Sequence, residues 1–408
     1  MLKAIKNQKS VPSTLWLLRL GSFCSNFMLM VPVAVLIYTG KGVTVGDFFL
    51  IQGLFRLAAF LFEIPSGYLS DRFSRRKVLI LGALIQALGF ATLALAYGFW
   101  EIVFGEALCG IASALFSGTL EAYTYDLLKR NNTQKHFLKE YGSIQTFGMS
   151  ASFIASVIGG LLYKYTGGNF LLWVMAAFCI LETFLYLLVP ELLEVRRKKA
   201  KNKTAFADAV GITYTTLKDN KLRNLILFPA FFSGFTIVLL WIMQPIMETS
   251  GVPLALFGVF FSINQFSAIF FSKYAYKICE KLGEIRVSVL TIWSLIIGIL
   301  LSLVVLHTTN MVLIYIACGL MYIVPAIRIL NNLQYNTLIH NDISSQKRGT
   351  VLSTRAMVST LFGAAILACA KLFLDKYGLQ STMIFTLIMT IILFISLHSV
   401  KKYIKNKK

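Results

Sequence analysis

The chain has 408 residues, of which 57% are hydrophobic and only 14% are charged, and its mean hydropathy is +0.72. A soluble domain of average composition is about 45–50% apolar and about 25% charged, so this composition excludes an ordinary soluble enzyme, a disordered chain and a disulfide scaffold. The six cysteines are scattered singly, without metal-ligand spacing, and are interpreted as small buried hydrophobes. The net charge of +21 does not indicate a nucleic-acid partner, because most basic residues fall in short gaps between apolar runs, as in membrane proteins.

Apolar runs recur along the whole chain, and each is close to the roughly 20 residues that a spanning helix needs. They are continuous rather than alternating in polarity, which favours helices over spanning strands. The sequence therefore predicts an all-α polytopic membrane protein with twelve transmembrane helices. The predicted spans are 14–38, 46–70, 78–97, 99–127, 141–163, 169–190, 222–248, 253–278, 286–306, 311–335, 349–374 and 379–399.

Lysine and arginine accumulate in every second gap, beginning with the Lys-rich start of the chain, and are sparse in the gaps between. The positive-inside rule then predicts that both termini are cytoplasmic, in a multi-pass protein of the cell inner (plasma) membrane. The first run has no small-residue cleavage site, so we expect a spanning helix there rather than a cleaved signal peptide.

The longest gap, 191–220, is polar and basic and divides the chain into six predicted spans on each side. We predict an N-terminal six-helix half at 1–190, a cytoplasmic linker at 191–220 and a C-terminal six-helix half at 221–408. Two such halves are typical of secondary transporters. A polytopic membrane enzyme or receptor is the alternative. No metalloprotease, P-loop or nucleophile-elbow motif is present, so we predict that the protein is not an enzyme.

The gap between the second and third spans carries the most specific motif. Its sequence from Gly67 to Leu79, GYLSDRFSRRKVL, resembles the loop 2–3 signature of the major facilitator superfamily, Gly-x-Leu-x-Asp-Arg-x-Gly-Arg-Arg/Lys-x-x-Leu, at every defined position except Ser74. Two shorter segments, 62–66 and 117–126, resemble bacterial drug and metabolite exporters of that superfamily. The resemblance covers essentially the whole chain and implies two six-helix halves that alternate access to a central cavity.

In that superfamily this loop is a conformational latch, which the resemblance carries over to five residues of the present motif. We expect Asp126, at the end of the fourth span, to be the acidic partner of the arginines, because charges at neighbouring helix ends pair there. The predicted latch residues are Gly67, Asp71, Arg72, Arg75, Arg76 and Asp126.

A charge inside a bilayer costs about 2.5–3.5 kcal/mol even on insertion scales, so each is a functional candidate. The acids at membrane depth are Glu63, Glu106, Glu121 and Glu182. Glu121 is the first choice as proton carrier, because the resemblance places its helix at the cavity and burial would favour its protonated form. Glu106 and Glu63 follow. The alternative is that these acids only form ion pairs that hold helices together.

Polar residues within the spans are candidates for a substrate cavity, although an isolated Asn or Gln in a spanning helix also serves as interhelical glue. The predicted cavity residues are Asn26, Arg56, Trp241, Gln244, Asn264, Gln265, Arg328 and Asn332. Arg328 and Arg355 are the deep positive charges of the second half, and we expect them to form a gate with acids of the first half.

These observations predict a monomeric secondary active transporter that exports a small organic molecule, drug-like or metabolic, in exchange for protons. Its partners would be that substrate, protons and membrane lipids, with the proton gradient in place of a cofactor and no metal. The alternatives are an uptake symporter for an anionic solute drawn to Arg56 and Arg328, a lipid flippase-like transporter, and a non-transporting membrane sensor.

Overall fold

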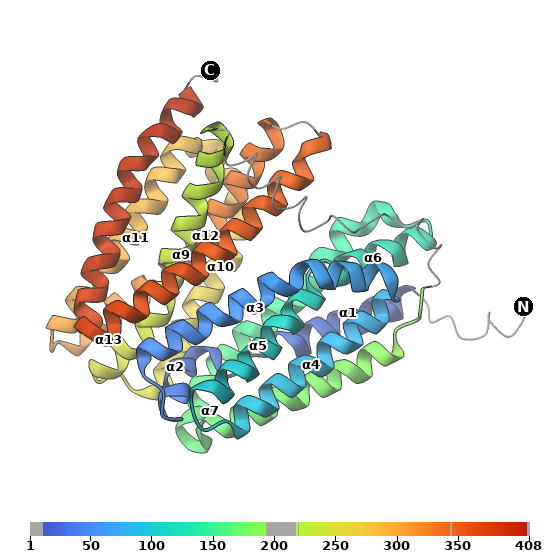
Figure 1. Cartoon of the computed structure of the whole chain (residues 1–408), viewed down its shortest axis with the longest axis horizontal. Coiled ribbons are helices and arrows are strands. Elements are labelled where there is room, and N and C mark those ends of the chain that lie inside the picture. The colour runs from blue at the N-terminus through green and yellow to red at the C-terminus, as the bar shows by residue number, and fades with distance from the viewer. Residues whose placement is uncertain (1–10, 193–217, 219, 343–344, 406–408) are drawn as a thin grey trace, which may run out of the picture. The chain divides into compact units, whose positions relative to one another are not determined.

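The computed structural model describes residues 11–192, 218, 220–342 and 345–405, and in this part every regular element is a helix. Figure 1 labels most of these helices. In chain order they are α1 (Val11–Ser25), the short 3₁₀ helix η2 (Val31–Val33), α2 (Ala34–Thr39), α3 (Val45–Arg72), α4 (Arg75–Leu95), α5 (Phe99–Phe116), α6 (Thr119–Arg130), η3 (Gln134–His136), α7 (Phe137–Leu188), α9 (Asn220–Thr249), α10 (Leu254–Leu282), α11 (Glu284–His307), α12 (Met311–Asp342) and α13 (Ser345–Lys405).

Nine helical segments of the described part are long and apolar enough to cross a membrane. The 52 residues of α7 would make a straight helix of about 78 Å, far more than the roughly 30 Å of a bilayer core. Gly167 in α7 (φ 75°) and Gly378 in α13 (φ 77°) leave the helical conformation and divide each into two predicted spans. Glycine accepts a positive φ because it has no Cβ. With α1 and α2 together as the first span, and α5 and α6 together as the fourth, these helices account for the twelve predicted spans. The predicted span 99–127 is thus interrupted at Gly118 (φ 69°) rather than continuous.

The contacts of the chain group it into two compact units. Unit 1 comprises 1–31 and 57–203, and unit 2 comprises 32–56 and 204–408. The beginning of α3 therefore packs with the C-terminal helices, although it lies in the predicted N-terminal half. Most of the predicted linker 191–220 lies outside the described residues, and the predicted boundaries stay a prediction.

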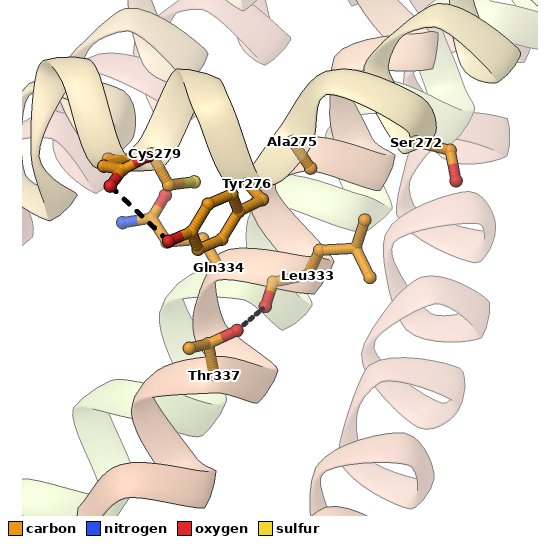
Figure 2. A pocket seen from close by; sticks show the side chains of 8 residues that line it. Ser272, Ala275, Tyr276, Cys279, Leu333, Gln334 and Thr337 are labelled. Atoms are coloured by element: carbon orange, nitrogen blue, oxygen red, sulfur yellow. Dashed lines mark hydrogen bonds between the residues drawn. The ribbon is translucent and has the colours of Figure 1, made fainter.

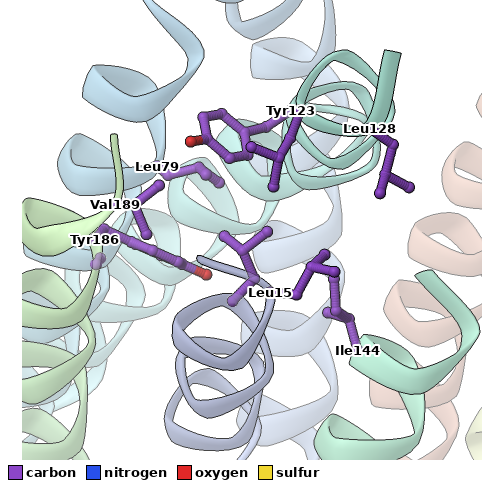
Figure 3. Close-up of a cluster of buried hydrophobic side chains, with 10 residues drawn as sticks. Leu15, Leu79, Tyr123, Leu128, Ile144, Tyr186 and Val189 are labelled. Carbon is purple, nitrogen blue, oxygen red and sulfur yellow. The ribbon is translucent and has the colours of Figure 1, made fainter. Parts of the chain in front are cut away.

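In unit 1, α7 packs along α1 and α4, and α4 also packs along α5 (Figure 1). Figure 3 shows the cluster of buried apolar side chains where α1, α4, α6 and α7 meet. The ring of Tyr186 lies so close to α1 that a Cβ on Gly21 would come within 2.8 Å of it. The hydroxyl of Tyr123 donates a hydrogen bond to the carbonyl of Pro190 at 2.7 Å. Such close packing holds helices together in a membrane. Moving an apolar side chain from lipid to a helix interface gains little free energy, because both surroundings are apolar.

In unit 2, α9 packs along α13, and α12 packs along α10 and α11. The glycines at helix contacts allow this closeness: a Cβ on Gly298 of α11 would lie 2.8 Å from Leu239 of α9 and 3.0 Å from Val324 of α12. The side chains of Leu239 and Val324 therefore pack directly against the backbone of α11 at Gly298. Pro229 and Pro245 lie inside α9, where each removes one backbone hydrogen bond.

The first predicted span, 14–38, is not one helix, which corrects the expectation of a continuous run. The helix ends at Ser25 and resumes at Ala34, because Pro32 disfavours helical backbone at the residue before it. Side chains add to the backbone bonds at the break. The Ser22 carbonyl accepts the Asn26 backbone N–H and also the Asn26 side-chain amide at 2.8 Å. The Asn26 carbonyl accepts the Met28 backbone N–H and also the Ser152 hydroxyl at 3.1 Å. A broken helix at membrane depth needs such partners, since lipid supplies none.

Candidate transport and coupling site

The loop motif joins three helices of unit 1. Arg75, at the first position of α4, is 8% exposed and forms an ion pair with Asp126 of α6. Its Nη1 also donates a hydrogen bond to the Ala122 carbonyl at 3.1 Å. Arg76 donates from Nε to the Tyr186 carbonyl at 3.2 Å and from Nη2 to the Leu187 carbonyl. Both carbonyls belong to the last turn of α7, where the regular helical bonds end, and the Tyr186 carbonyl also accepts the Val189 backbone N–H at 3.3 Å.

Other positions of the motif complete its description. Ser74 accepts a hydrogen bond from the Lys77 amide and caps α4, which explains how a serine serves where the superfamily signature has glycine. Gly67 is exposed, and a Cβ there would meet open space. The side chains of Asp71 and Arg72 lie outside the described residues. The role of the six residues as a latch therefore stays a prediction.

A second charged contact lies beside this motif, outside the membrane-spanning segments. The Lys77 ammonium is 3.6 Å from a carboxylate oxygen of Glu191. A hydrogen bond from Ser74, together with the nearby charges of Lys77 and Arg76, holds the pKa of Glu191 below its usual range. The motif thus contacts the chain on both sides of the end of α7.

The three acids predicted to carry protons have different surroundings. Glu121, predicted to be buried, is exposed: α6 buries Tyr123, Thr124 and Leu127 on one face, and Glu121 lies on the other. Glu63 is also exposed and accepts a hydrogen bond from the Ser117 hydroxyl at 3.0 Å. Glu106 is buried in α5, with 5% of its surface exposed. Their roles in proton coupling stay predictions.

The most deeply buried of the membrane acids is Glu182, which sequence reasoning noted at membrane depth but did not choose. It lies in the second part of α7, is 0% exposed, and neither carboxylate oxygen makes a hydrogen bond of normal geometry. Its polar neighbours are Ser25 of α1 and Tyr186, with the thiols of Cys24 and Cys179 close by. The signal in the sequence was its position in a run, 169–190, that contains no basic residue.

Two arginines of unit 2 are less buried than Glu182 and lack counter-charges among the described residues. Arg56 of α3 and Arg328 of α12 are both half-buried, and Arg328 lies close enough to repel the Arg56 guanidinium. Neither has a carboxylate within 4.0 Å among the described residues. Arg355 of α13 differs, because it donates hydrogen bonds to the Asn332 carbonyl, to Oδ1 of Asn332 and to Oδ1 of Asn336. The predicted gate formed by Arg328 and Arg355 stays a prediction.

This geometry, twelve spans with the signature loop bridging α4, α6 and α7, agrees with a comparison of the sequence with known families. A sequence profile of the Major Facilitator Superfamily matches residues 15–367. The chain belongs to this superfamily, whose members are transporters. Membership confirms the predicted all-α, twelve-helix fold and the resemblance seen in the motif.

Two relatives match the sequence over only part of the chain. An uncharacterized transporter of Buchnera aphidicola from Acyrthosiphon pisum, BU466, is 30% identical over 38% of this chain. The bacillibactin exporter of Bacillus subtilis is 29% identical over 34% of it. The chain spans about 40% and 35% of the length of these two relatives. The crystal structure of the nucleoside transporter NupG matches with a TM-score of 0.82 at 14% identity, over 96% of this chain and 100% of that chain, which shows the shared fold.

Most polar residues predicted to line the superfamily's cavity are engaged inside unit 1 or unit 2. Gln244 is fully buried and accepts a hydrogen bond from the Val35 amide at 2.9 Å, at the beginning of α2. The Asn264 amide donates to the Tyr322 carbonyl at 3.0 Å, and joins α10 to α12. The Trp241 ring packs edge-on against the ring of Phe48, with 5.1 Å between the centroids.

The Asn26 side chain donates a hydrogen bond to the Ser22 carbonyl beside the helix break. Asn332 accepts hydrogen bonds from Arg355. Gln265 is half-buried. Of the eight predicted cavity residues, Arg56 and Arg328 are therefore the charged pair that the described contacts leave without an intramolecular counter-charge. Whether any of the eight touches substrate stays a prediction.

A cavity of about 480 Å³ lies between α10 and α12 in unit 2, away from the predicted cavity residues (Figure 2). Tyr276 and Gln334 contribute to it, and the Tyr276 hydroxyl donates a hydrogen bond to Glu280 at 3.4 Å. None of the predicted cavity residues lines it. Among the described residues, no group of three or more His, Cys, Asp or Glu side chains is placed to hold a metal ion.

Proposed function

We propose that the protein is a proton-coupled exporter of a small organic molecule, with Glu182 as its proton carrier. The observation that carries the coupling is the complete burial of this carboxyl without a hydrogen bond of normal geometry. An ionised carboxylate in such surroundings is disfavoured, so this packing favours the neutral form of Glu182. Export is supported by the exporter-like motif segments and by the similarity to the bacillibactin exporter.

The position of Glu182 places the proposed proton site beside the break between α1 and α2. Its neighbour Ser25 is the last residue of α1, directly before the break that precedes α2. The Ser25 hydroxyl also donates to Gln86 of α4 at 3.3 Å. A change in the broken segment would therefore move a polar group that contacts the carboxyl, and deprotonation of the carboxyl would favour a different arrangement of the break. We propose Glu182 rather than the exposed Glu121 for this reason.

Alternating access requires contacts that form and separate at the two ends of the helices. Arg75 and Asp126 supply such a contact at one end, which we propose is cytoplasmic, as are both termini. Asp47, Lys371 and Asp375 supply another within unit 2, at the end where α3 begins. We propose that the protein works as a monomer in the inner membrane.

A transport assay in proteoliposomes tests this function. Compounds that raise the melting temperature of the purified protein in a screen of drugs and metabolites would be added outside vesicles containing the pH dye pyranine. An antiporter releases protons as the compound enters, whereas a symporter takes both in the same direction. E182Q is expected to bind the compound but to move it without protons.

The control for this assay is E121Q, which removes an exposed acid and should leave the proton movement unchanged. If E182Q retained proton-coupled transport, the assignment of Glu182 would be wrong, and E106Q would be tested next. Binding without any flux would identify a sensor instead. An uptake symporter for an anionic solute remains the second candidate, supported by Arg56 and Arg328.

A further inference from the structure

Two guanidinium groups of unit 2 differ from the other basic side chains of the described helices that are not exposed. Arg19 is paired with Glu140, Arg75 with Asp126, and Lys371 with two aspartates. Arg56 and Arg328, in contrast, form no ion pair and donate no hydrogen bond within the described part of the chain. Each is half-buried, and the two charges repel each other.

The packing around Arg56 holds it in this position. The backbone of α3 approaches α13 so closely that a Cβ on Gly53 would lie 3.2 Å from the Ala364 carbonyl oxygen. One turn further along α3, the Arg56 side chain passes over Gly363, where a Cβ would lie 3.6 Å from Nη1. The absence of a side chain at Gly363 therefore leaves room for the guanidinium against α13.

Arg328 comes from the third helix of this region, α12, one turn after the buried Pro325. Proline inside a helix leaves an unpaired carbonyl and a kink. Arg328 lies close enough to repel the Arg56 guanidinium, and Arg56 itself lies against Gly363 of α13. The helices α3 and α12 therefore bring two forked, charged donors near each other within unit 2.

Arg355 shows how the same unit provides hydrogen-bond acceptors for a buried arginine. Arg355 is 5% exposed, and its guanidinium donates hydrogen bonds to oxygens of Asn332 and Asn336. Among the residues that the structure describes, no comparable set of acceptors surrounds Arg56 or Arg328. A pair of like charges at membrane depth without acceptors is unfavourable, and a ligand that supplies acceptors would remove the penalty.

We propose that Arg56 and Arg328 bind the anionic group of the transported substrate: a carboxylate, sulfonate or phosphate on a small organic body. Guanidinium groups bind such oxyanions through paired, charge-assisted hydrogen bonds. This inference rests on the proposed transport function and adds the chemical class of the substrate to it. It does not depend on the direction of transport or on Glu182.

Ligand binding to the purified full chain in detergent tests the inference without a gradient. The probes are benzoate, benzenesulfonate and phenyl phosphate, each compared with neutral benzamide at the same ionic strength. At least one anion at saturating concentration should raise the melting temperature by about 2–4 °C, whereas benzamide should not. R56Q and R328Q should each abolish this shift, and R286Q, which removes an exposed arginine of α11, should keep it.

The lysine variants R56K and R328K separate binding from folding. They keep the charge and lose the fork, so they should fold like the wild type and bind the anion at least tenfold more weakly. The inference is overturned if no anion exceeds benzamide, or if the shift survives in both glutamine variants. A shift with phosphatidylglycerol alone would assign the pair to a lipid headgroup and would also overturn it.

The same variants distinguish this inference from the proposed function. Anion binding that R56Q abolishes, without proton movement in proteoliposomes, would refute proton-coupled export and leave the anion site standing. Proton-coupled transport of neutral compounds, together with no anion binding, would refute the anion site and leave proton-coupled export standing.

Discussion

The ammonium of Lys371 lies 2.6 Å from Oδ1 of Asp47 and so joins α13 to the beginning of α3. Asp47 has a second task, because its Oδ2 accepts a hydrogen bond from the Thr44 amide at 3.0 Å while the Thr44 hydroxyl accepts one from the Asp47 amide at 2.9 Å. This reciprocal pair is a capping box. Lys371 also contacts Asp375 at 2.7 Å. One carboxylate thus both begins a helix and anchors it to another.

The two tasks of Asp47 should separate in two variants. D47N keeps an oxygen for the Thr44 amide but loses the ion pair, and should lower the free energy of unfolding by about 1 kcal/mol. D47A also loses the cap and should lower it by about 1 kcal/mol more. Thermal unfolding of the purified protein measures both.

A double-mutant cycle with K371M shows whether the ion pair is the cause. The D47N and K371M effects should be less than additive by about 1 kcal/mol. K376M is the matched control, because Lys376 is exposed on the same helix, forms no ion pair with a described residue, and lies over the ring of Tyr377 in cation–π geometry at 5.2 Å. Full additivity of D47N and K371M would show that the pair contributes nothing.

The ion pair of Arg75 and Asp126 should matter more than the neighbouring pair of Lys77 and Glu191. Arg75 is 8% exposed, so D126N would leave a buried guanidinium with a weaker acceptor and should cost about 2 kcal/mol of unfolding free energy. E191Q removes a solvent-exposed partner 3.6 Å from Lys77 and should change the stability by a few tenths of a kcal/mol at most. Equal effects of the two variants would contradict the importance of burial here.

Transport should respond to this region independently of stability. D71N is expected to abolish transport while leaving membrane insertion and folding largely intact, because the prediction gives this residue a role in one conformation rather than in the core. The measurement is uptake into proteoliposomes at equal protein content. Normal turnover by well-folded D71N would remove the latch assignment.

Glu191 gives a pH dependence whose direction is fixed by its surroundings. Its pKa is lowered by the Ser74 hydrogen bond and by the charges of Lys77 and Arg76, so the folded state binds its proton more weakly than the unfolded state. Its contribution to stability is therefore present above the unfolded value of about 4.3 and is lost as the pH falls through the lowered folded pKa. The stability difference between wild type and E191Q should shrink between pH 5 and about pH 3. A difference that grows on acidification would refute this.

E182Q should be unusual among substitutions of a buried charged residue, because it should not destabilise the protein. If the carboxyl is held in its neutral form, glutamine matches its shape and charge, and the free energy of unfolding at pH 7 should change by less than about 1 kcal/mol. E182A should cost about 2–3 kcal/mol through the cavity it leaves. A large loss of stability in E182Q alone would show that the ionised form is structural.

Hydropathy was enough to place most helices, because the span of an apolar run and the backbone's need for internal hydrogen bonds in lipid leave few alternatives. For α4, the predicted 78–97 compares with Arg75–Leu95. Hydropathy did not reveal the break at 26–33, because a helix and a broken helix of the same apolar residues have the same transfer energy. Pro32 and Asn26 were the local signals.

The polar contacts were harder to predict, because sequence shows residue types and not their partners. Asp126 was expected beside the motif arginines on charge alone, and it contacts Arg75. Gln244 was expected in a cavity, but it accepts a backbone hydrogen bond across a helix interface. The cluster of Lys371 and Asp47 was missed because both lie near the ends of apolar runs. The Thr44-x-x-Asp47 spacing was the available signal.

The break in the first span depends on a close contact with α7 that a single methyl group can test. A Cβ on Gly148 would lie 2.8 Å from Oγ of Ser22 and 2.9 Å from Nδ2 of Asn26, the residue whose amide satisfies the backbone at the break. G148A should therefore push α1 from α7 and lower the free energy of unfolding by about 1–3 kcal/mol. It should also impair transport, because it displaces the segment that contacts Glu182 through Ser25.

The matched control for G148A is G142A in the same helix, where an added Cβ meets nothing within 4 Å. Alanine is favoured over glycine inside a helix by up to about 1 kcal/mol, so G142A should be neutral or stabilising. The difference between the two variants then isolates the contact from the change in helix propensity. S22A in the G148A background removes Oγ and should restore part of the stability, since it takes away one of the two close atoms. If G148A and G142A had the same effect on unfolding, the approach of α7 to the break would not be tight enough to constrain the first span.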